Sequence, residues 1–358
     1  MDKDEFRAKA PAKTRGALAR WLQWLLGLAV SVTALALAVR GVRVTDMLAA
    51  LRQTHYAYIA LAVGFNFLGL GARALSWYII LGRQVPYTRT FWALNEGYLL
   101  NNFLPLRLGE VGRAYLVSRG RPLRTSQAFS SVLVERVIDL CMIMGLLGIF
   151  LPVVAGLSWA RQAALVWVLV TVLALAGLSV VARSREPLLQ LFRRVAGRIP
   201  RLNGPRWEAR LGAFVDGMGA LRDGRRFALA ALCSGLAWVL AGAGNSVLLM
   251  SLPIRLSAPA VVVGFFALVV TGLGASLPSA PASAGIFELS VVAALSVFHV
   301  ESSLAMTYAL AYHLVFFGLT SGLGALALMR EGESLAHLAR AAQEFLGGEK
   351  TPAEISAE

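Results

Sequence analysis

Three ionisable residues lie within two turns of one apolar segment, in the run Glu-Arg-Val-Ile-Asp at 135–139. Glu135 and Asp139 are four residues apart, so a helix would place both carboxylates on one face, with Arg136 about 100° around the axis from Glu135. Charged groups are costly in hydrocarbon, and within a membrane they face a bundle interior or a watery cavity. The cluster is a candidate site for a lipid headgroup or a proton. The alternative is a structural ion pair near the membrane interface.

The apolar pattern breaks at two places, 95–113 and 277–288, with the same order of residue types: proline, then glycine four residues later, then a carboxylate. The residues are Pro105, Gly109 and Glu110 in the first break, and Pro278, Pro281, Gly285 and Glu288 in the second. Paired interruptions of this kind point to a transporter's central site, built from two re-entrant segments that form a weak internal repeat. The alternative is that both breaks are ordinary cytoplasmic loops.

Glu288 stands in the first turn of a predicted half-helix that follows the second break. A carboxylate inside a membrane is functional by default, and the plainer alternative is a cap at the helix N-terminus. Arg73 and Asn66 are seven residues apart and share a helix face. Arg73 either joins the polar site or extends its side chain to the inner interface.

The remaining polar candidates are Asn101, Asn102, Asn245 and His313, which either line a cavity or hold neighbouring helices together. Arg113 follows the first break. Gly318 and Gly322 are interpreted as helix packing only. The sequence has no Walker A motif and no H-E-x-x-H, and its four histidines are scattered, so neither a cofactor nor a metal is expected.

The elements that must position these residues follow from the composition. The chain has 358 residues, of which 57% are hydrophobic and 15% charged, with a mean hydropathy of +0.65. Soluble proteins are about 45–50% apolar and about 25% charged. This excludes an ordinary soluble protein and predicts an all-α polytopic membrane protein. The two cysteines fall inside apolar runs, which excludes a disulfide framework.

Eight apolar runs are interpreted as spans, of which the seventh is shorter than a typical span. They cover 21–39, 56–82, 131–151, 161–181, 227–252, 258–276, 286–299 and 303–329. The transmembrane domain is therefore expected over 21–329, between a basic N-terminus (1–20) and a polar tail (330–358). The polar stretch 183–226 is expected to be a linker with an amphipathic helix on the inner leaflet. The first run is longer than a cleavable signal segment and is expected to be an uncleaved anchor.

The connections alternate in basic charge. Lys and Arg number six in 1–20, seven in 83–130 and eleven in 182–226, whereas the opposite connections hold far fewer. The positive-inside rule then places both termini in the cytoplasm of a protein of the inner, cytoplasmic membrane. The net charge of +14 suits anionic headgroups, and no nucleic-acid partner is expected because the basic residues flank spans.

Three ordered motifs resemble the lysylphosphatidylglycerol synthase transmembrane-region family, also called flippase-like domain proteins. They are Asn101-Asn102-x-x-Pro105-x-Arg107-x-Gly109-Glu110-x-x-Arg113, Glu135-Arg136-x-x-Asp139, and Pro278-x-x-Pro281-x-x-x-Gly285-x-x-Glu288. The resemblance covers about 21–329 and implies an eight-span bundle with two re-entrant segments. In two-part members this region is associated with moving aminoacylated phosphatidylglycerol between leaflets, and a separate cytoplasmic domain attaches the amino acid. Stand-alone members are associated with polyprenyl-linked glycans or hopanoids. Pro281-Ala-Ser-Ala-Gly285 departs from the family's usual Pro-Gly-Gly-x-Gly.

The expected function is a lipid flippase or transporter rather than an enzyme, with membrane lipids as partners: an anionic phospholipid or a polyprenyl-linked lipid. Arg113 and Arg136 would contact phosphate. Glu135, Asp139 and Glu288 would meet a cationic group or carry protons, and the same site would include Arg73, Asn101, Asn102 and Glu110. Two alternatives stay open, a membrane-embedded transferase acting on a lipid-linked substrate and an accessory subunit in lipid or cell-envelope glycan synthesis. A homo-oligomer is also compatible with the sequence.

Overall fold

The computed structural model of the chain describes residues 28–104, 108–120, 123–155, 183–196, 211–276 apart from 213, and 280–331, with scattered positions between 162 and 180. This part of the chain is helical and contains no strand. The helices are Leu28–Ala38, α2 (Val44–Arg52), α3 (Tyr56–Ile80), α4 (Tyr87–Phe103), α5 (Leu108–Ser118), α6 (Thr125–Ala155), α8 (Arg185–Ala196), α10 (Gly224–Met250), α11 (Ala260–Gly274), α12 (Ile286–Ser296) and α13 (Ser302–Glu331), with the 3-10 turns η1 (Gly219–Leu221) and η2 (Pro281–Ser283).

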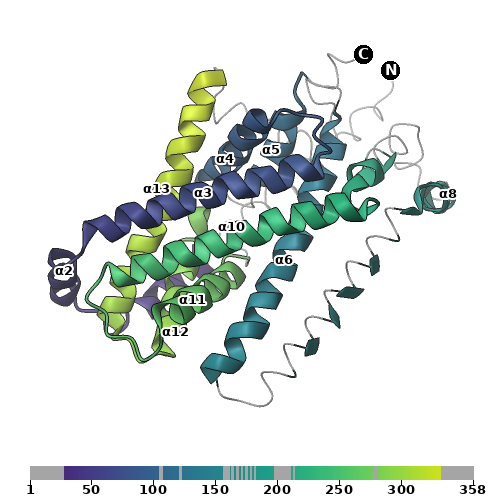
Figure 1. Cartoon of the computed structure of the whole chain (residues 1–358). Coiled ribbons are helices and arrows are strands. Elements are labelled where there is room, and N and C mark those ends of the chain that lie inside the picture. The colour runs from purple at the N-terminus through teal and green to yellow at the C-terminus, as the bar shows by residue number, and fades with distance from the viewer. Residues whose placement is uncertain are drawn as a thin grey trace, which may run out of the picture.

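The long helices α3 and α10 run side by side in opposite directions across the bundle (Figure 1). Their contact includes a hydrogen bond from the Ser76 hydroxyl to the Ala230 carbonyl at 2.8 Å. Asp223 caps the start of α10 by accepting the backbone N–H groups of Arg225 and Arg226. The pair α3 and α10 therefore forms a rigid wall against which α6, α11 and α13 pack.

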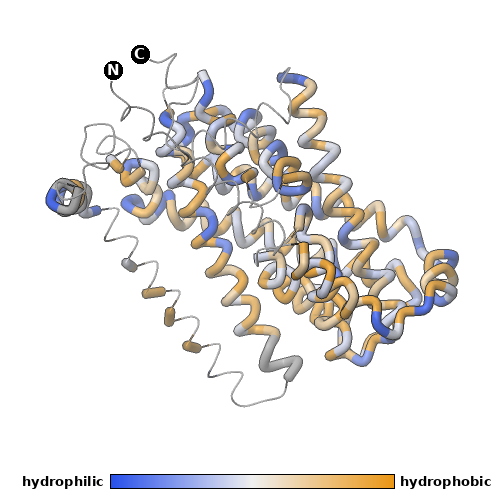
Figure 2. The backbone as a smooth tube through the Cα atoms, turned by 180° about the vertical axis from the view of Figure 1, so that it is seen from behind, coloured by the Kyte–Doolittle hydropathy of each residue, from blue (hydrophilic) through white to orange (hydrophobic). Residues whose placement is uncertain are grey.

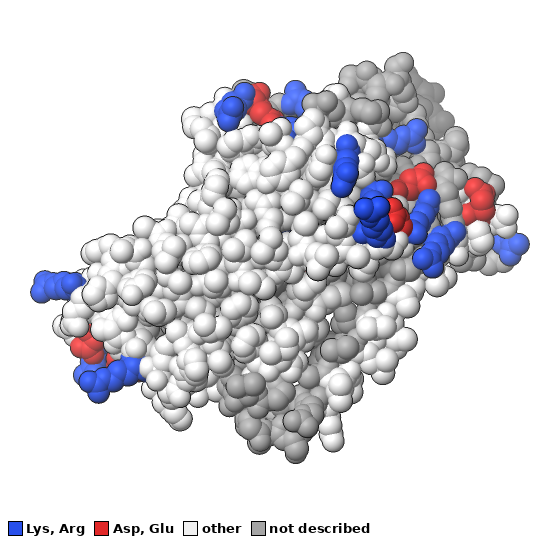
Figure 3. All heavy atoms as spheres, in the orientation of Figure 1, with Lys and Arg blue, Asp and Glu red and all other residues white. Residues whose placement is uncertain are grey.

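Many large apolar side chains lie on the outside of the bundle, among them Leu232, Leu314 and Met329, each at least 70% exposed. The tube is orange along the middle of its helices and bluer toward their ends (Figure 2). On the face drawn in Figure 3, the charged side chains gather at the two ends and leave a broad uncharged belt between them. An apolar belt of this kind suits contact with lipid. In water the same surface would promote aggregation.

Within the part of the chain that the structure describes, three helices are long and apolar enough to cross a membrane, namely α3, α10 and α13. They correspond to the expected spans 56–82, 227–252 and 303–329. The expected span 131–151 lies inside the longer α6. The expected spans 258–276 and 286–299 appear as the shorter helices α11 and α12. The described part of the first expected span is Leu28–Ala38, and the fourth falls largely outside the described residues.

The first break is not an ordinary loop. The helices α4 and α5 stand on either side of it and are packed against each other. Ten of the eleven residues of α5 are buried, and Glu96 of α4 is completely buried. The close approach requires Gly109, because a Cβ there would meet the Gly97 carbonyl and the Asn101 side chain. The described part of this stretch is therefore helical and mostly buried, which does not fit the alternative of an ordinary loop, and residues 105–107 lie outside the described residues.

The described part of the second break, from residue 280 onward, contains a compact turn before α12. Ala282 and Ser283 have positive φ angles of 56° and 57°, and Gly285 follows with φ 86°. The backbone N–H of Ala280 donates to the Ser31 hydroxyl at 2.9 Å, which holds the turn against the helix Leu28–Ala38. A Cβ at residue 285 would collide with the Ser31 carbonyl. Glycine is required at this position by both its conformation and its surroundings.

Candidate functional site

Glu135 of α6 is the centre of a buried ionic network. Its carboxylate accepts hydrogen bonds from Arg113 at 2.8 Å and Arg136 at 3.0 Å. Arg73 of α3 lies 3.5 Å from the same carboxylate. The side chain of Glu135 is only 1% exposed, and three helices contribute the arginines that surround it. The carboxylate therefore ties α3 and α5 to α6.

Asp139 lies one turn further along α6 and extends the network toward α10. It accepts a hydrogen bond from Arg73 at 2.6 Å and lies 3.4 Å from Arg136. Its other oxygen accepts the Nε1–H of Trp238 at 3.1 Å and faces the Ser234 hydroxyl at 3.4 Å. The predicted shared face of Glu135 and Asp139 is confirmed, because Arg73 contacts both.

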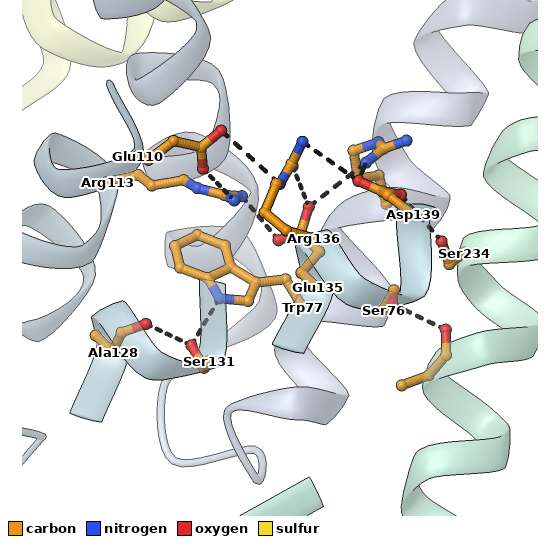
Figure 4. Close-up of polar contacts among 12 residues, drawn as sticks. Ser76, Trp77, Glu110, Arg113, Ala128, Ser131, Glu135, Arg136, Asp139 and Ser234 are labelled. Carbon is orange, nitrogen blue, oxygen red and sulfur yellow. Dashed lines mark hydrogen bonds and ion pairs between the residues drawn. The ribbon is translucent and has the colours of Figure 1, made fainter. Parts of the chain in front are cut away.

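Glu110 completes the network on the side of the first break (Figure 4). It accepts a hydrogen bond from Arg113 at 2.7 Å, and its other oxygen lies 3.8 Å from Nε of Arg136. Its side chain is 20% exposed, more than that of Glu135 or Asp139. Glu110 is thus the most accessible carboxylate of the network.

Two tryptophans flank the arginines. The Arg113 guanidinium lies over the Trp77 ring at 4.7 Å from its centroid, and the Arg73 guanidinium lies 5.9 Å from that of Trp238. Trp77 donates its Nε1–H to the Ser131 hydroxyl at 3.0 Å (Figure 4). Aromatic faces attract guanidinium groups and exclude water from them. The tryptophans therefore fix the arginines in an apolar setting.

Among the described residues, the charges of this network balance: three arginines meet three carboxylates, which are Arg73, Arg113, Arg136, Glu110, Glu135 and Asp139. A neutral cluster costs far less in an apolar bundle than any member alone. Two donors nevertheless have no acceptor within the described part of the chain, the buried Nε–H groups of Arg113 and Arg136. Guanidinium groups with spare N–H donors are suited to binding a phosphate, whose oxygens match their geometry.

Arg73 joins this network, and the interpretation that it extends to the interface is wrong. Its side chain is 16% exposed and forms ion pairs with Glu135 and Asp139. The two buried carboxylates stabilise the Arg73 guanidinium inside the bundle, so the side chain does not extend to the membrane interface. Asn66, on the same helix, instead donates to the Ala62 carbonyl at 2.9 Å.

The asparagines of the first motif hold helices together. Asn101 accepts the backbone N–H of Gly109 at 2.9 Å across the break, and Asn102 donates to the hydroxyls of Thr320 and Ser321 on α13. Asn245 of α10 accepts the Tyr308 hydroxyl at 2.8 Å. These contacts fit the alternative in which the asparagines pack helices. Pro105 and Pro278 lie outside the described residues.

Glu288 has a separate setting in the second break. It accepts the backbone N–H of Gly285 at 2.6 Å, and its other oxygen lies 2.5 Å from Nδ1 of His313 on α13. Its position in the first turn of α12 is confirmed. The cap and the inter-helix contact are both present, so this carboxylate pairs with His313 rather than with the arginines.

The sequence interpretation did not single out Trp77 and Trp238. A tryptophan in an apolar helix carries one N–H donor that needs a partner when it is buried. That signal exists in the sequence, but the partner depends on how α3, α6 and α10 are arranged. The pairing of Trp238 with Asp139 joins residues 99 positions apart.

Comparison with known proteins places these residues in a family. Residues 24–324 match the family model described as the lysylphosphatidylglycerol synthase TM region. The chain is 27% identical to a protein named glycosyltransferase AglD from Haloferax volcanii, over 77% of this chain and 49% of that protein. It is also 27% identical to a UPF0104 membrane protein from Methanothermobacter thermautotrophicus, over 75% of this chain and 81% of that protein. The chain thus spans about half the length of the first of these relatives.

Proposed function

The chain belongs to the lysylphosphatidylglycerol synthase TM region family, and from that membership and the buried network we propose that it moves a phosphate-bearing lipid between the leaflets of the cytoplasmic membrane. The carrying observation is the cluster of three arginines and three carboxylates inside an apolar bundle, in which two guanidinium N–H groups have no acceptor among the described residues. The proposal includes eight spans, two re-entrant segments related as a repeat, and both termini in the cytoplasm.

The network supplies what a headgroup needs during crossing. Hydrocarbon about 30 Å thick opposes any charge, so a phosphate must be matched by cations along its path. In the proposed step, the phosphate displaces Glu110, the most accessible carboxylate, from Arg113 and Arg136. The Nε–H groups of Arg113 and Arg136, which have no hydrogen-bond acceptor in the described part of the chain, then provide additional donors to the phosphate oxygens. Trp77 and Trp238 keep the arginines oriented while the carboxylate is away.

Proteoliposomes test this proposal. Purified protein is reconstituted with trace fluorescent phosphatidylglycerol, phosphatidylethanolamine or a short polyprenyl phosphate, and a membrane-impermeant quencher reports which leaflet holds the label. Transfer well above protein-free liposomes for at least one phosphate-bearing lipid supports the proposal. Transfer no faster than in protein-free liposomes for all three lipids, with monodisperse protein, contradicts it.

A second function is a transferase acting on a lipid-linked substrate. It is favoured by the relative named a glycosyltransferase, although this chain covers only 49% of that protein. A transferase changes the mass of its lipid substrate, whereas a transporter changes only its leaflet. Mass spectrometry of the lipids recovered from the same vesicles, supplied with a sugar donor, separates the two.

A further inference from the structure

A second titratable site lies apart from the arginine network, where α12 meets α13. Glu288 is 5% exposed and His313 is 17% exposed, and their closest side-chain atoms are 2.5 Å apart. The Phe287 ring lies 4.5 Å from the His313 ring, and Phe317 lies 6.1 Å from it on another side. The pair is therefore a short, enclosed contact between a carboxylate and an imidazole.

Few other titratable groups face this pair. Among the described residues, neither α11 nor the helix Leu28–Ala38, which both lie against this region, carries one. On α13 the nearest are Tyr312 and Tyr308, whose rings are tilted against each other with centroids 6.0 Å apart. A tyrosine hydroxyl is ordinarily neutral near pH 7. On α4, which contacts η2, Tyr98 packs on Phe316. The charge of this region therefore depends chiefly on Glu288 and His313.

From this geometry we propose that Glu288 and His313 form a proton-binding site that couples the lipid movement proposed above to a pH gradient. With both ring nitrogens protonated, the His313 imidazolium donates Nδ1–H to the Glu288 carboxylate and the pair is neutral overall. When water removes the proton from Nε2, the neutral imidazole keeps Nδ1–H and the pair carries one net negative charge. A net charge in an apolar bundle is costly, so it favours opening toward water or the approach of a cation.

The second break connects this change of charge to the backbone around α12. The carboxylate also accepts the N–H of Gly285, where the chain has φ 86°, so the same side chain fixes the turn and ties α12 to α13. Loss of the proton weakens one of the two polar contacts that Glu288 makes in the first turn of the 11-residue helix α12. The pair thereby links the charge state of one imidazole to the position of α12. The coupling rests on the proposed lipid movement, whereas the proton site does not.

Nuclear magnetic resonance tests the proton site directly. Protein labelled with ¹⁵N-histidine in nanodiscs is titrated from pH 5 to pH 9, and His313→Gln identifies the signal of interest among the four histidines. The expected result is a change of protonation at His313 within this range that Glu288→Gln alters. If His313 keeps one protonation state throughout, or if Glu288→Gln leaves its midpoint unchanged, the proton site is overturned.

Proteoliposomes with an imposed pH gradient test the coupling. The gradient should change the rate of lipid transfer at least severalfold in the wild type and in the control His299→Asn, and should have no effect in His313→Gln. His299 is exposed and has φ 57°, a conformation that asparagine tolerates. A gradient response that persists in His313→Gln overturns the coupling. If His313 titrates as expected but no lipid crosses, the transport proposal fails and the proton site stands.

Discussion

Arg113 of α5 donates a 2.8 Å hydrogen bond to Glu135 of α6, and both side chains are at most 3% exposed. Removing one partner of a buried pair leaves an uncompensated charge, which costs about 3–5 kcal/mol. Arg113→Met is therefore expected to lower the free energy of unfolding by that amount, measured by denaturation in detergent micelles.

The double variant Arg113→Met with Glu110→Gln separates charge balance from lost contacts. It removes one cation and one anion, so the four remaining charges balance again. It should recover part of the stability lost in the single variant, while lipid transfer stays abolished because a phosphate-binding arginine is missing. A double variant no more stable than Arg113→Met would contradict the charge-balance argument.

Glu110→Gln alone should strengthen the binding of anionic lipid. This change leaves three arginines facing two carboxylates, and the amide competes less well than the carboxylate for Arg113 and Arg136. An increase of roughly tenfold in affinity for phosphatidylglycerol corresponds to about 1.4 kcal/mol. Native mass spectrometry of the protein with titrated lipid measures it, with a zwitterionic lipid as the control, and weaker binding of phosphatidylglycerol would count against the displacement step.

Trp238→Phe should weaken the tie between α10 and α6. The substitution keeps an aromatic ring near Arg73 but removes the N–H that Asp139 accepts at 3.1 Å. A hydrogen bond to a charged group contributes about 1.5–3 kcal/mol. A double-mutant cycle with Asp139→Asn should show a favourable coupling energy between the two side chains. Additive effects of the two substitutions would mean that the contact contributes nothing to stability.

Gly285→Ala should destabilise the second break by about 1–3 kcal/mol, because residue 285 has φ 86° and a Cβ would meet the Ser31 carbonyl. Gly318→Ala is the matched control, since a Cβ at that helical position meets nothing within 4 Å. The control should be neutral or slightly stabilising. Equal melting temperatures for the two variants would show that the turn tolerates a side chain.

The pattern of apolar runs was enough to predict α3, α10 and α13, because spans of this length follow from composition alone. The carboxylate face of α6 was also predictable, since four-residue spacing fixes it. Arg73 was ambiguous because its ion pairs join residues 62 and 66 positions apart in the chain. The first break left an ordinary loop open as the alternative, because the polar residues of α4 and α5 resemble a loop until Gly97 and Gly109 bring the two helices together.

The most direct test of the central claim compares lipid transfer by Arg136→Ala and Arg43→Ala in the same proteoliposomes. Arg136 contacts all three carboxylates of the network, whereas Arg43 is 71% exposed and pairs with Asp46 at the bundle surface. Phosphate-bearing lipid should cross with wild-type protein and with Arg43→Ala, and should cross at the protein-free rate with folded Arg136→Ala. Wild-type transfer by folded Arg136→Ala would contradict the claim that this network carries the headgroup.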